Sequence, residues 1–192
     1  ETDGAGRVAS VKAGASPEGA ERLAGPVIPG LPNVHSHAFQ RAMAGLAEHS
    51  SGRGDSFWTW REEMYRLALT MEPDQMGAVA RMLYVEMLEG GFVSVGEFHY
   101  LHHGKDGRPY DEPALMSDVL VEAAARAGIG LTLLPVLYMS SDLGAEPALP
   151  EQRRFLWDPE GLLGAVAGLQ ARHGGEARVG MALHSLRAVP ER

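Results

Sequence analysis

Strand-like and helix-like segments alternate along most of this chain, and this alternation restricts its fold more than any other feature of the sequence. Apolar residues at spacings of three and four, with glycine close behind, predict helices at residues 73–89, 112–127 and 159–172. Apolar runs predict strands at 92–98, 129–138 and 178–184, and the end of 27–34 predicts a first buried strand. Strands that alternate with helices in this way favour a parallel α/β sheet.

A parallel sheet of this kind has two possible architectures, a small open sheet or one half of an eight-stranded barrel. Open nucleotide-binding sheets carry a glycine-rich turn where a helix begins, whereas Gly90-Gly91 and Gly174-Gly175 fall where helices end. A complete (β/α)8 barrel needs about 250 residues. This chain has 192 residues and stops just after its last predicted strand, so it has room for only part of a barrel.

Residues 38–73 form a long connection between the first predicted strand and the first of these helices. Within this connection, Asp55 is the predicted N-cap of a further helix that includes Trp58 and Trp60. Connections of this length inside compact domains are usually functional lids or binding loops. The two tryptophans fit a lid and fit equally well a helix packed on the core, and the sequence leaves this choice open.

The composition argues against several classes of protein. The chain has 17 Lys and Arg against 25 Asp and Glu, a net charge of −8, which disfavours binding to nucleic acid or to an anionic membrane. No run approaches the roughly 18 apolar residues of a membrane span, and residues 1–30 show no signal-peptide pattern. The absence of cysteine excludes a disulfide scaffold and a thiolate metal site, and it fits a soluble intracellular protein.

His35-Ser36-His37 is the sharpest chemical feature of the sequence. Residues two apart on a strand point to the same side, so both imidazoles can reach one ion at the C-terminal end of the strand, where α/β barrels place their active sites. A catalytic zinc site uses three protein ligands and water, so two histidines leave the set incomplete. The alternative is a chance pair, with one ring capping a turn and the other in solvent. The apolar strand before the pair and the long connection after it make the two interpretations about equal.

Glu97-Phe98-His99-Tyr100 ends the second predicted strand at the same edge of the sheet. In extended geometry Glu97 and His99 share one face, and Phe98 and Tyr100 share the other. We expect a polar group of this run to point at a substrate, and the alternative is a hydrogen-bonded loop.

The remaining histidines give weaker signals. A second metal site that uses His102 and His103 is disfavoured, because adjacent histidines diverge and an exposed turn follows them. His49 and His173 fit solvent-exposed positions. His184 and Arg187 end the last predicted strand, where an arginine can clamp a substrate carboxylate with two parallel hydrogen bonds. Taken alone, Arg187 is better explained as a surface residue paired with a helix carboxylate.

Several longer stretches together resemble one known family. They are residues 31–45 (LPNVHSHAFQRAMAG), 57–61 (FWTWR), 97–100 (EFHY), 130–138 (GLTLLPVLY), 152–155 (QRRF) and 184–189 (HSLRAV). Over about residues 25–189 the chain is similar to formimidoylglutamate deiminase, of the amidohydrolase superfamily. A bare H-x-H marks only the superfamily, whereas the run that begins at His35 together with the run at His184 is far more specific.

The resemblance implies a distorted (β/α)8 barrel, with residues 1–26 as a segment of a small β domain and residues 27–192 as the first half of the barrel. It implies one zinc ion per complete subunit, with His35 and His37 as two of its ligands. The substrate-contact positions that it implies are Gln40, Arg61, Tyr100, His184 and Arg187. The implied reaction is hydrolysis of the formimino group of N-formimino-L-glutamate to N-formyl-L-glutamate and ammonia, a step of histidine degradation. A cytoplasmic homodimer without nucleic-acid or membrane partners is expected.

The chain departs from the family in one respect. The family takes its third zinc histidine, its general-base histidine and its zinc-binding aspartate from strands five, six and eight, which these 192 residues do not contain. We therefore assign no catalytic residue within this chain and expect the natural protein to be longer. Two alternatives stay open: another deaminase of the superfamily, with a purine, pyrimidine or triazine substrate, and a catalytically inactive fragment or binding module.

Overall fold

The computed structural model describes residues 1–192 except 5–6, 22–23, 49–53, 55 and 191–192. The elements, in chain order, are β1 (Leu31–Ser36), the 3-10 helix η1 (Ala38–Met43), α1 (Phe57–Thr70), α2 (Pro73–Glu89), β2 (Phe92–His99), α3 (Leu115–Ala127), β3 (Gly130–Leu137), the 3-10 helix η2 (Pro150–Gln152), α4 (Pro159–His173), β4 (Arg178–Val179) and β5 (Ala182–Leu183).

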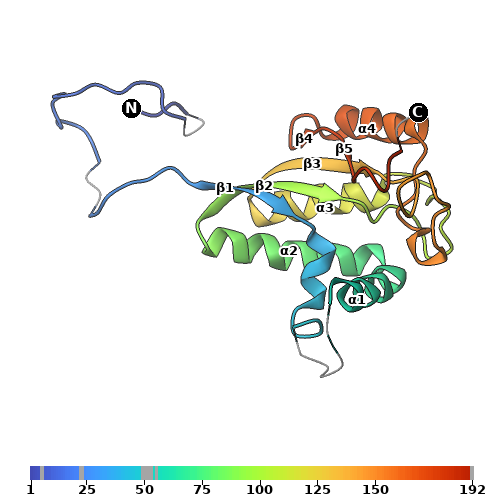
Figure 1. Ribbon diagram of the computed structural model, residues 1–192. Helices are drawn as coiled ribbons and strands as arrows, with labels where there is room; N and C mark the ends of the chain where they lie inside the picture. Colours follow the sequence, from blue (N-terminus) through green and yellow to red (C-terminus); the bar gives the residue numbers. More distant parts are fainter. Residues whose placement is uncertain (5–6, 22–23, 49–53, 55, 191–192) are drawn as a thin grey trace.

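All strands are parallel and follow one another across the sheet in the order β1-β2-β3-β4, while β5 pairs with β3 beyond β4. The central pair runs in register from Ser94 opposite Gly130 to His99 opposite Pro135. Helix α2 packs on β2, α3 on β3, and α4 on β3 and β4 (Figure 1). A strand order that follows chain order is the order of a (β/α)8 barrel, whereas doubly wound sheets reverse at a switch point. The predicted α/β class is confirmed, and the sheet matches part of a barrel.

The helix boundaries follow from local chemistry. Pro73 and Pro159 occupy first-turn positions of α2 and α4, where the missing N–H costs nothing. The Asp158 carboxylate accepts a 2.8 Å hydrogen bond from Gly161 N and so caps α4, as its place before Pro159 in the sequence suggests. Gly128 ends α3 in the left-handed region at φ 84°, which a residue without a Cβ adopts at low cost.

Helix α1 begins with a cap that differs from the predicted one. Asp55 lies outside the described residues, and the side chain that caps the helix is Ser56. The Ser56 hydroxyl accepts from Trp58 N at 3.2 Å, and Thr59 Oγ1 accepts from Ser56 N at 3.0 Å. This reciprocal pair fixes where α1 starts and therefore which of its residues reach the site.

The first and last strands differ from the predictions. The expected buried first strand is wrong, because in β1 the side chains of Leu31 and Val34 are 48% and 85% exposed. Among the described residues, β1 pairs only with β2, through an irregular register. The predicted strand 178–184 exists but is interrupted at Gly180-Met181, which separates β4 from β5.

The described part of the N-terminal segment runs out from the body of the chain as an extended arm (Figure 1). Within this segment, Thr2 and Val8 form an antiparallel bridge. Assignment of residues 1–26 to a small β domain, and of 27–192 to a half barrel, stays a prediction. Within the described part of the chain, the helices are too short or too polar to span a membrane.

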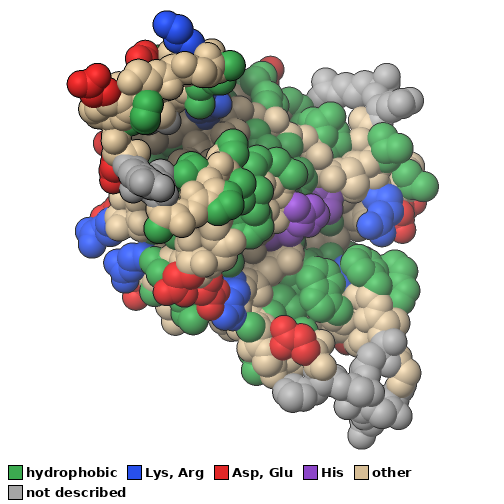
Figure 2. Space-filling view, turned by 90° about the vertical axis from the view of Figure 1, so that its left-hand side faces the viewer, with side chains coloured by type: hydrophobic (Ala, Val, Ile, Leu, Met, Phe, Trp, Pro, Cys, Tyr) green, Lys and Arg blue, Asp and Glu red, His purple; other side chains and the backbone are tan. Residues whose placement is uncertain are grey.

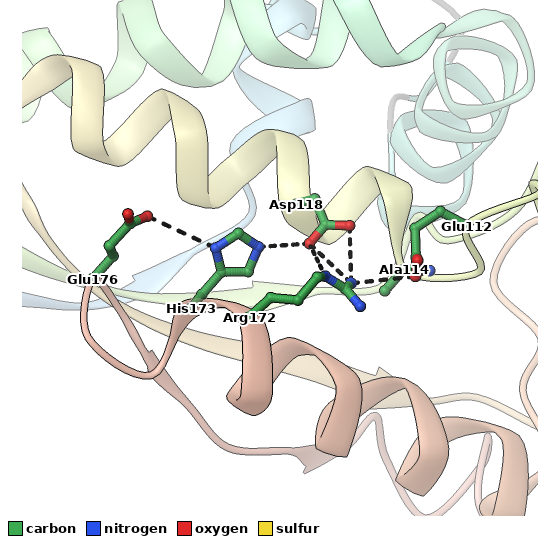
Figure 3. Close-up of polar contacts among 6 residues, drawn as sticks. All are labelled: Glu112, Ala114, Asp118, Arg172, His173 and Glu176. Carbon is green, nitrogen blue, oxygen red and sulfur yellow. Dashed lines mark hydrogen bonds and ion pairs between the residues drawn. The ribbon is translucent and has the colours of Figure 1, made fainter.

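A cluster of charged groups joins α3 to the end of α4 (Figure 3). Asp118 accepts from Arg172 Nη2 at 3.0 Å and lies 2.7 Å from His173 Nε2, while Glu176 lies 3.7 Å from the other ring nitrogen. The prediction that His173 is a solvated histidine is therefore wrong, since its side chain is only 20% exposed. Because cations near a helix C-terminus interact favourably with the helix dipole, this arrangement stabilises the helix pair. The other histidine assigned to solvent, His49, lies outside the described residues.

Candidate active site

A cavity of about 640 Å³ opens at the C-terminal ends of the strands. It is lined by every side chain that the family resemblance implied as a metal ligand or a substrate contact: His35, His37, Gln40, Arg61, Tyr100, His184 and Arg187. These residues come from β1, η1, α1 and the segments after β2 and β5, so only the tertiary fold brings them together. In the space-filling view, histidine side chains reach the surface amid hydrophobic ones (Figure 2).

His35 and His37 lie side by side in this cavity. Their ring centroids are 5.0 Å apart and the ring planes are inclined by 78°. His37 Nδ1 lies 3.0 Å from the carbonyl oxygen of Phe98, a contact that requires Nδ1 to carry the hydrogen and leaves Nε2 with a free lone pair. Burial lowers the pKa of His37, which favours the neutral ring.

A neutral imidazole whose Nδ1–H is held by a backbone carbonyl is the usual form of a zinc ligand. The histidine pair therefore fits a metal ion in donor type and in the tautomer of His37. Within the described ranges no cluster of three or more His, Asp or Glu side chains could enclose an ion. The pair thus supplies part of a metal site.

A buried carboxylate holds the backbone on both sides of His37. Glu97 accepts from Ser36 Oγ and from Ala38 N, each at 2.6 Å, and from Tyr84 OH at 3.4 Å. Burial raises the pKa of Glu97 to about 6, although these donors oppose the shift. Glu97 thus fixes the turn from β1 into η1.

The orientation of the run at residues 97–100 corrects one expectation. Glu97 and His99 are each 1% exposed and face away from the cavity, whereas Phe98 and Tyr100 line it. The expectation that a polar group points into the site holds for Tyr100 and is wrong for Glu97 and His99. The helices cover one face of β2, and the register places Glu97 and His99 on that covered face.

Tyr100 sits at the centre of the cavity wall. Its hydroxyl accepts a hydrogen bond from Gln40 Nε2, and its ring makes edge contacts with His37 and His184 at centroid distances of 5.5 and 5.3 Å. Burial raises the pKa of Tyr100, so the phenol stays neutral. Burial also lowers the pKa of His184 to about 4, with smaller contributions from His37 and Arg187, so this ring is neutral at physiological pH.

Two arginines give the cavity its charge. The Arg61 guanidinium lies 4.4 Å from the ring centroid of Trp58 and 5.6 Å from that of Tyr65. Arg187 lines the same cavity from the segment after β5. In the described part of the chain, neither arginine forms an ion pair with a carboxylate, in contrast to the surface pairing considered for Arg187. Both positive charges therefore face the cavity.

The two tryptophans of α1 have different roles. Trp60 lines the cavity and packs on the core, while Trp58 is 54% exposed and supports Arg61 from outside. Phe57, which sequence analysis did not assign to the site, also lines the cavity and stacks on Trp60 at 5.8 Å.

The histidines after β2 are buried outside the cavity. His102 and His103 are each 3% exposed, and their Nε2 atoms lie against the carbonyl oxygens of Val136 and Leu156 at 3.0 and 2.5 Å. Burial lowers the pKa of both rings. The structure therefore places both rings in the packed interior, held against backbone carbonyls.

Arg154, next to these histidines, was also missed. It is fully buried and donates to backbone carbonyls at His103 (2.7 Å), Met71 (2.8 Å) and Ala68. A buried guanidinium that serves several carbonyls ties the loop of η2 to the end of α1. Its sequence signal was only its place within the QRRF motif.

Comparison with known proteins agrees with this geometry. No family model matches the chain. Atrazine chlorohydrolase from Arthrobacter aurescens, solved with zinc, shares the fold with a TM-score of 0.64 at 20% identity, over 83% of this chain and 35% of that one. An amidohydrolase from Brucella melitensis has a TM-score of 0.82 and 52% identity over 88% of this chain and 40% of that one. The fold is thus the partial α/β barrel of an amidohydrolase.

One curated relative is more specific. Formimidoylglutamate deiminase of Pseudomonas aeruginosa is 51% identical over 185 residues, which are 96% of this chain. The resemblance to formimidoylglutamate deiminase is therefore confirmed over nearly the whole chain. The chain spans 41% of the length of that relative, so it corresponds to part of that protein.

Proposed function

We propose that this chain forms the first half of a formimidoylglutamate deiminase, which hydrolyses N-formimino-L-glutamate to N-formyl-L-glutamate and ammonia. The observation that carries the proposal is the joint placement of His35, His37, Arg61 and Arg187 around one cavity. Two imidazoles suit a zinc ion, and two guanidiniums suit a substrate with two carboxylates. The close relative supports this choice of substrate.

In the proposed site, His35 and His37 hold a zinc ion together with ligands from outside this chain. Zinc, when bound, acts as a Lewis acid that activates water at neutral pH. The hydrogen bond from His37 Nδ1 to the Phe98 carbonyl fixes the ring and would leave the Nε2 lone pair free to hold the ion. Glu97 holds the backbone around His37 and so maintains the position of the pair.

The other lining residues bind and orient the substrate. Arg61 and Arg187 neutralise its carboxylates, and the stack of Arg61 on Trp58 keeps the guanidinium in place. Neutral Tyr100 and neutral His184 offer hydrogen bonds to the uncharged parts of the substrate. Gln40 fixes the Tyr100 hydroxyl. We propose no general base within this chain.

Aromatic side chains complete the cavity wall. They are Phe57, Trp60, Tyr65, Phe98, Tyr138 and Phe155. Apolar lining of this kind lowers the local dielectric and so strengthens the attraction between the arginines and a carboxylate.

The experiment uses the full-length protein that carries this chain, loaded with zinc. We expect ammonia release from formiminoglutamate, complete loss after chelation, and recovery when zinc is restored. A metal-replete protein that releases no ammonia would reject the assignment. Release of ammonia from a purine, pyrimidine or triazine instead would favour the sibling deaminases, whose substrates lack a carboxylate for Arg187. Metal-dependent binding without any turnover would favour a non-catalytic module.

The proposed function also implies a pathway, a location and an oligomeric state for the full-length protein. The reaction would serve histidine degradation in the cytoplasm, and the full-length enzyme would be a homodimer that acts on a small molecule without nucleic-acid or membrane partners. Gel filtration with light scattering tests the dimer, and fractionation of the source cells tests the location.

A further inference from the structure

A buried amide joins two tyrosines behind the cavity wall. Gln152, in η2, is fully buried, and its Nε2 donates to the hydroxyls of Tyr65 and Tyr138, each at 2.9 Å. Tyr65 comes from α1 and Tyr138 follows β3, and both line the cavity. One side chain from a loop therefore connects two walls of the site.

The orientation of this amide is fixed by a third contact. The backbone N–H of Leu149 donates to Gln152 Oε1 at 2.8 Å. Because a backbone N–H cannot accept a hydrogen bond, this contact identifies the oxygen and leaves both amide hydrogens for the two tyrosines. Each tyrosine oxygen is therefore an acceptor toward Gln152, and each phenolic hydrogen points elsewhere.

The two phenolic hydrogens have few destinations. The contacts with Gln152 use the oxygen of each hydroxyl and leave both phenolic hydrogens unused. A phenolic hydrogen is therefore left for an acceptor in the cavity. The pKa of Tyr138 is raised, mainly by burial and then by Tyr65, so the hydroxyl stays protonated.

The surroundings select an anion as this acceptor. The Arg61 guanidinium lies over the Tyr65 ring at 5.6 Å, and the charges of Arg61 and Arg187 both act on the Tyr138 hydroxyl. A hydroxyl donor beside two guanidiniums offers hydrogen-bond donors and positive charge, and a carboxylate is the kind of acceptor that binds to such a group.

We propose that Gln152 is a positioning residue that orients the Tyr65 and Tyr138 hydroxyls so that a phenolic hydrogen, together with Arg61 and Arg187, binds a substrate carboxylate. The identity of the substrate in this inference rests on the proposed function. Gln152 itself does not line the cavity and acts only through the two tyrosines.

Two variants test the inference in the full-length zinc protein. Gln152→Glu keeps the size of the side chain and an acceptor for Leu149 N–H, but it replaces the donor by an oxygen that attracts the phenolic hydrogens. The double variant Tyr65→Phe/Tyr138→Phe removes both hydroxyls and keeps Gln152. The matched control is Tyr110→Phe, which removes a hydroxyl that accepts from Arg154 outside the cavity.

Two readouts are measured, turnover of formiminoglutamate and binding of L-glutamate by titration calorimetry. We expect both test variants to raise KM and the Kd for glutamate by about 10- to 100-fold, the loss of one hydrogen bond to a charged group, with kcat changed less than about threefold. Tyr110→Phe is expected to behave like the wild type. If Gln152→Glu does not fold, the double variant decides.

The outcomes separate this inference from the proposed function. Wild-type turnover with unchanged KM and Kd in the folded test variants overturns the inference alone, as does a fall in kcat at constant KM. If the wild type binds glutamate but turns over no formiminoglutamate, the proposed function is overturned. If the variants also lose glutamate binding in that case, the inference is supported. A wild type that binds no glutamate overturns the inference.

Discussion

Replacement of Glu97 by glutamine should change how stability depends on pH. Glu97 is 1% exposed, and its oxygens accept from Ser36 Oγ, Ala38 N and Tyr84 OH. Glutamine keeps the shape, its oxygen can accept from Ala38 N, and both hydroxyls can rotate to accept from its amide. The substitution therefore removes the ionisation of this group while most of the hydrogen bonds can persist.

The size of the effect follows from the pKa. Burial raises the pKa of Glu97 from 4.5 to about 6, which corresponds to about 2 kcal/mol at 1.36 kcal/mol per unit. A pKa that is higher in the folded state means that the folded protein holds the proton more tightly. The stability from this group is therefore fully present below pH 4.5 and is lost as the pH rises through about 6.

The assay is urea unfolding of wild type and Glu97→Gln, followed by tryptophan fluorescence at pH 4 and pH 7.5. We expect the variant to gain about 2 kcal/mol relative to the wild type between these two pH values. Glu62→Gln, on the exposed face of α1, serves as the matched control and should show no such gain. A difference between Glu97→Gln and wild type that is the same at both pH values would refute the reasoning.

Three further predictions concern two residues of the site and one buried arginine outside it. Arg187→Ala should raise KM for formiminoglutamate about 10- to 100-fold with little change in kcat, and steady-state kinetics that show no rise would contradict the carboxylate clamp. His37→Ala should abolish stoichiometric zinc in the full-length protein, measured by atomic emission, and retention of tight zinc would remove His37 from the ligand set. Arg154→Met should lower the free energy of unfolding by about 3 kcal/mol, because several buried carbonyls lose their donor. Urea titration measures this loss. The control is Arg108→Met, because the Arg108 side chain is 87% exposed, and it should lower the free energy of unfolding by less than about 0.5 kcal/mol. Equal losses in the two variants would contradict the buried role of Arg154.

Local patterns in the sequence accounted for the elements well. The apolar spacing and the terminal glycines placed α2 at its observed bounds, and they placed α4 within one residue. The first and last strands were exceptions: the predicted strand 178–184 is interrupted, and the apolar residues of the first strand predicted burial while Val34 is 85% exposed. Whether an apolar strand is covered depends on what packs against its faces, and Val34 lines the open cavity.

Most residues of the candidate site could be predicted only from the family resemblance, because local sequence patterns do not indicate them. The His35–His37 pair could be proposed from its spacing, but Gln40, Arg61 and Tyr100 carry no local signal for a shared cavity. Gln152 had even less signal, because it acts from a buried position through residues far from it in the chain, Tyr65 and Tyr138.

The sequence by itself determined the alternation of strands and helices, the parallel sheet and the histidine pair, because these depend on periods of two and 3.6 residues within short segments. Only the tertiary structure decided which face of residues 97–100 meets the cavity. The period of two pairs Glu97 with His99 and Phe98 with Tyr100, but it does not say which pair the helices cover. That choice depends on long-range packing of α2 and α3 on the sheet, as does the meeting of Arg61 and Arg187 in one cavity.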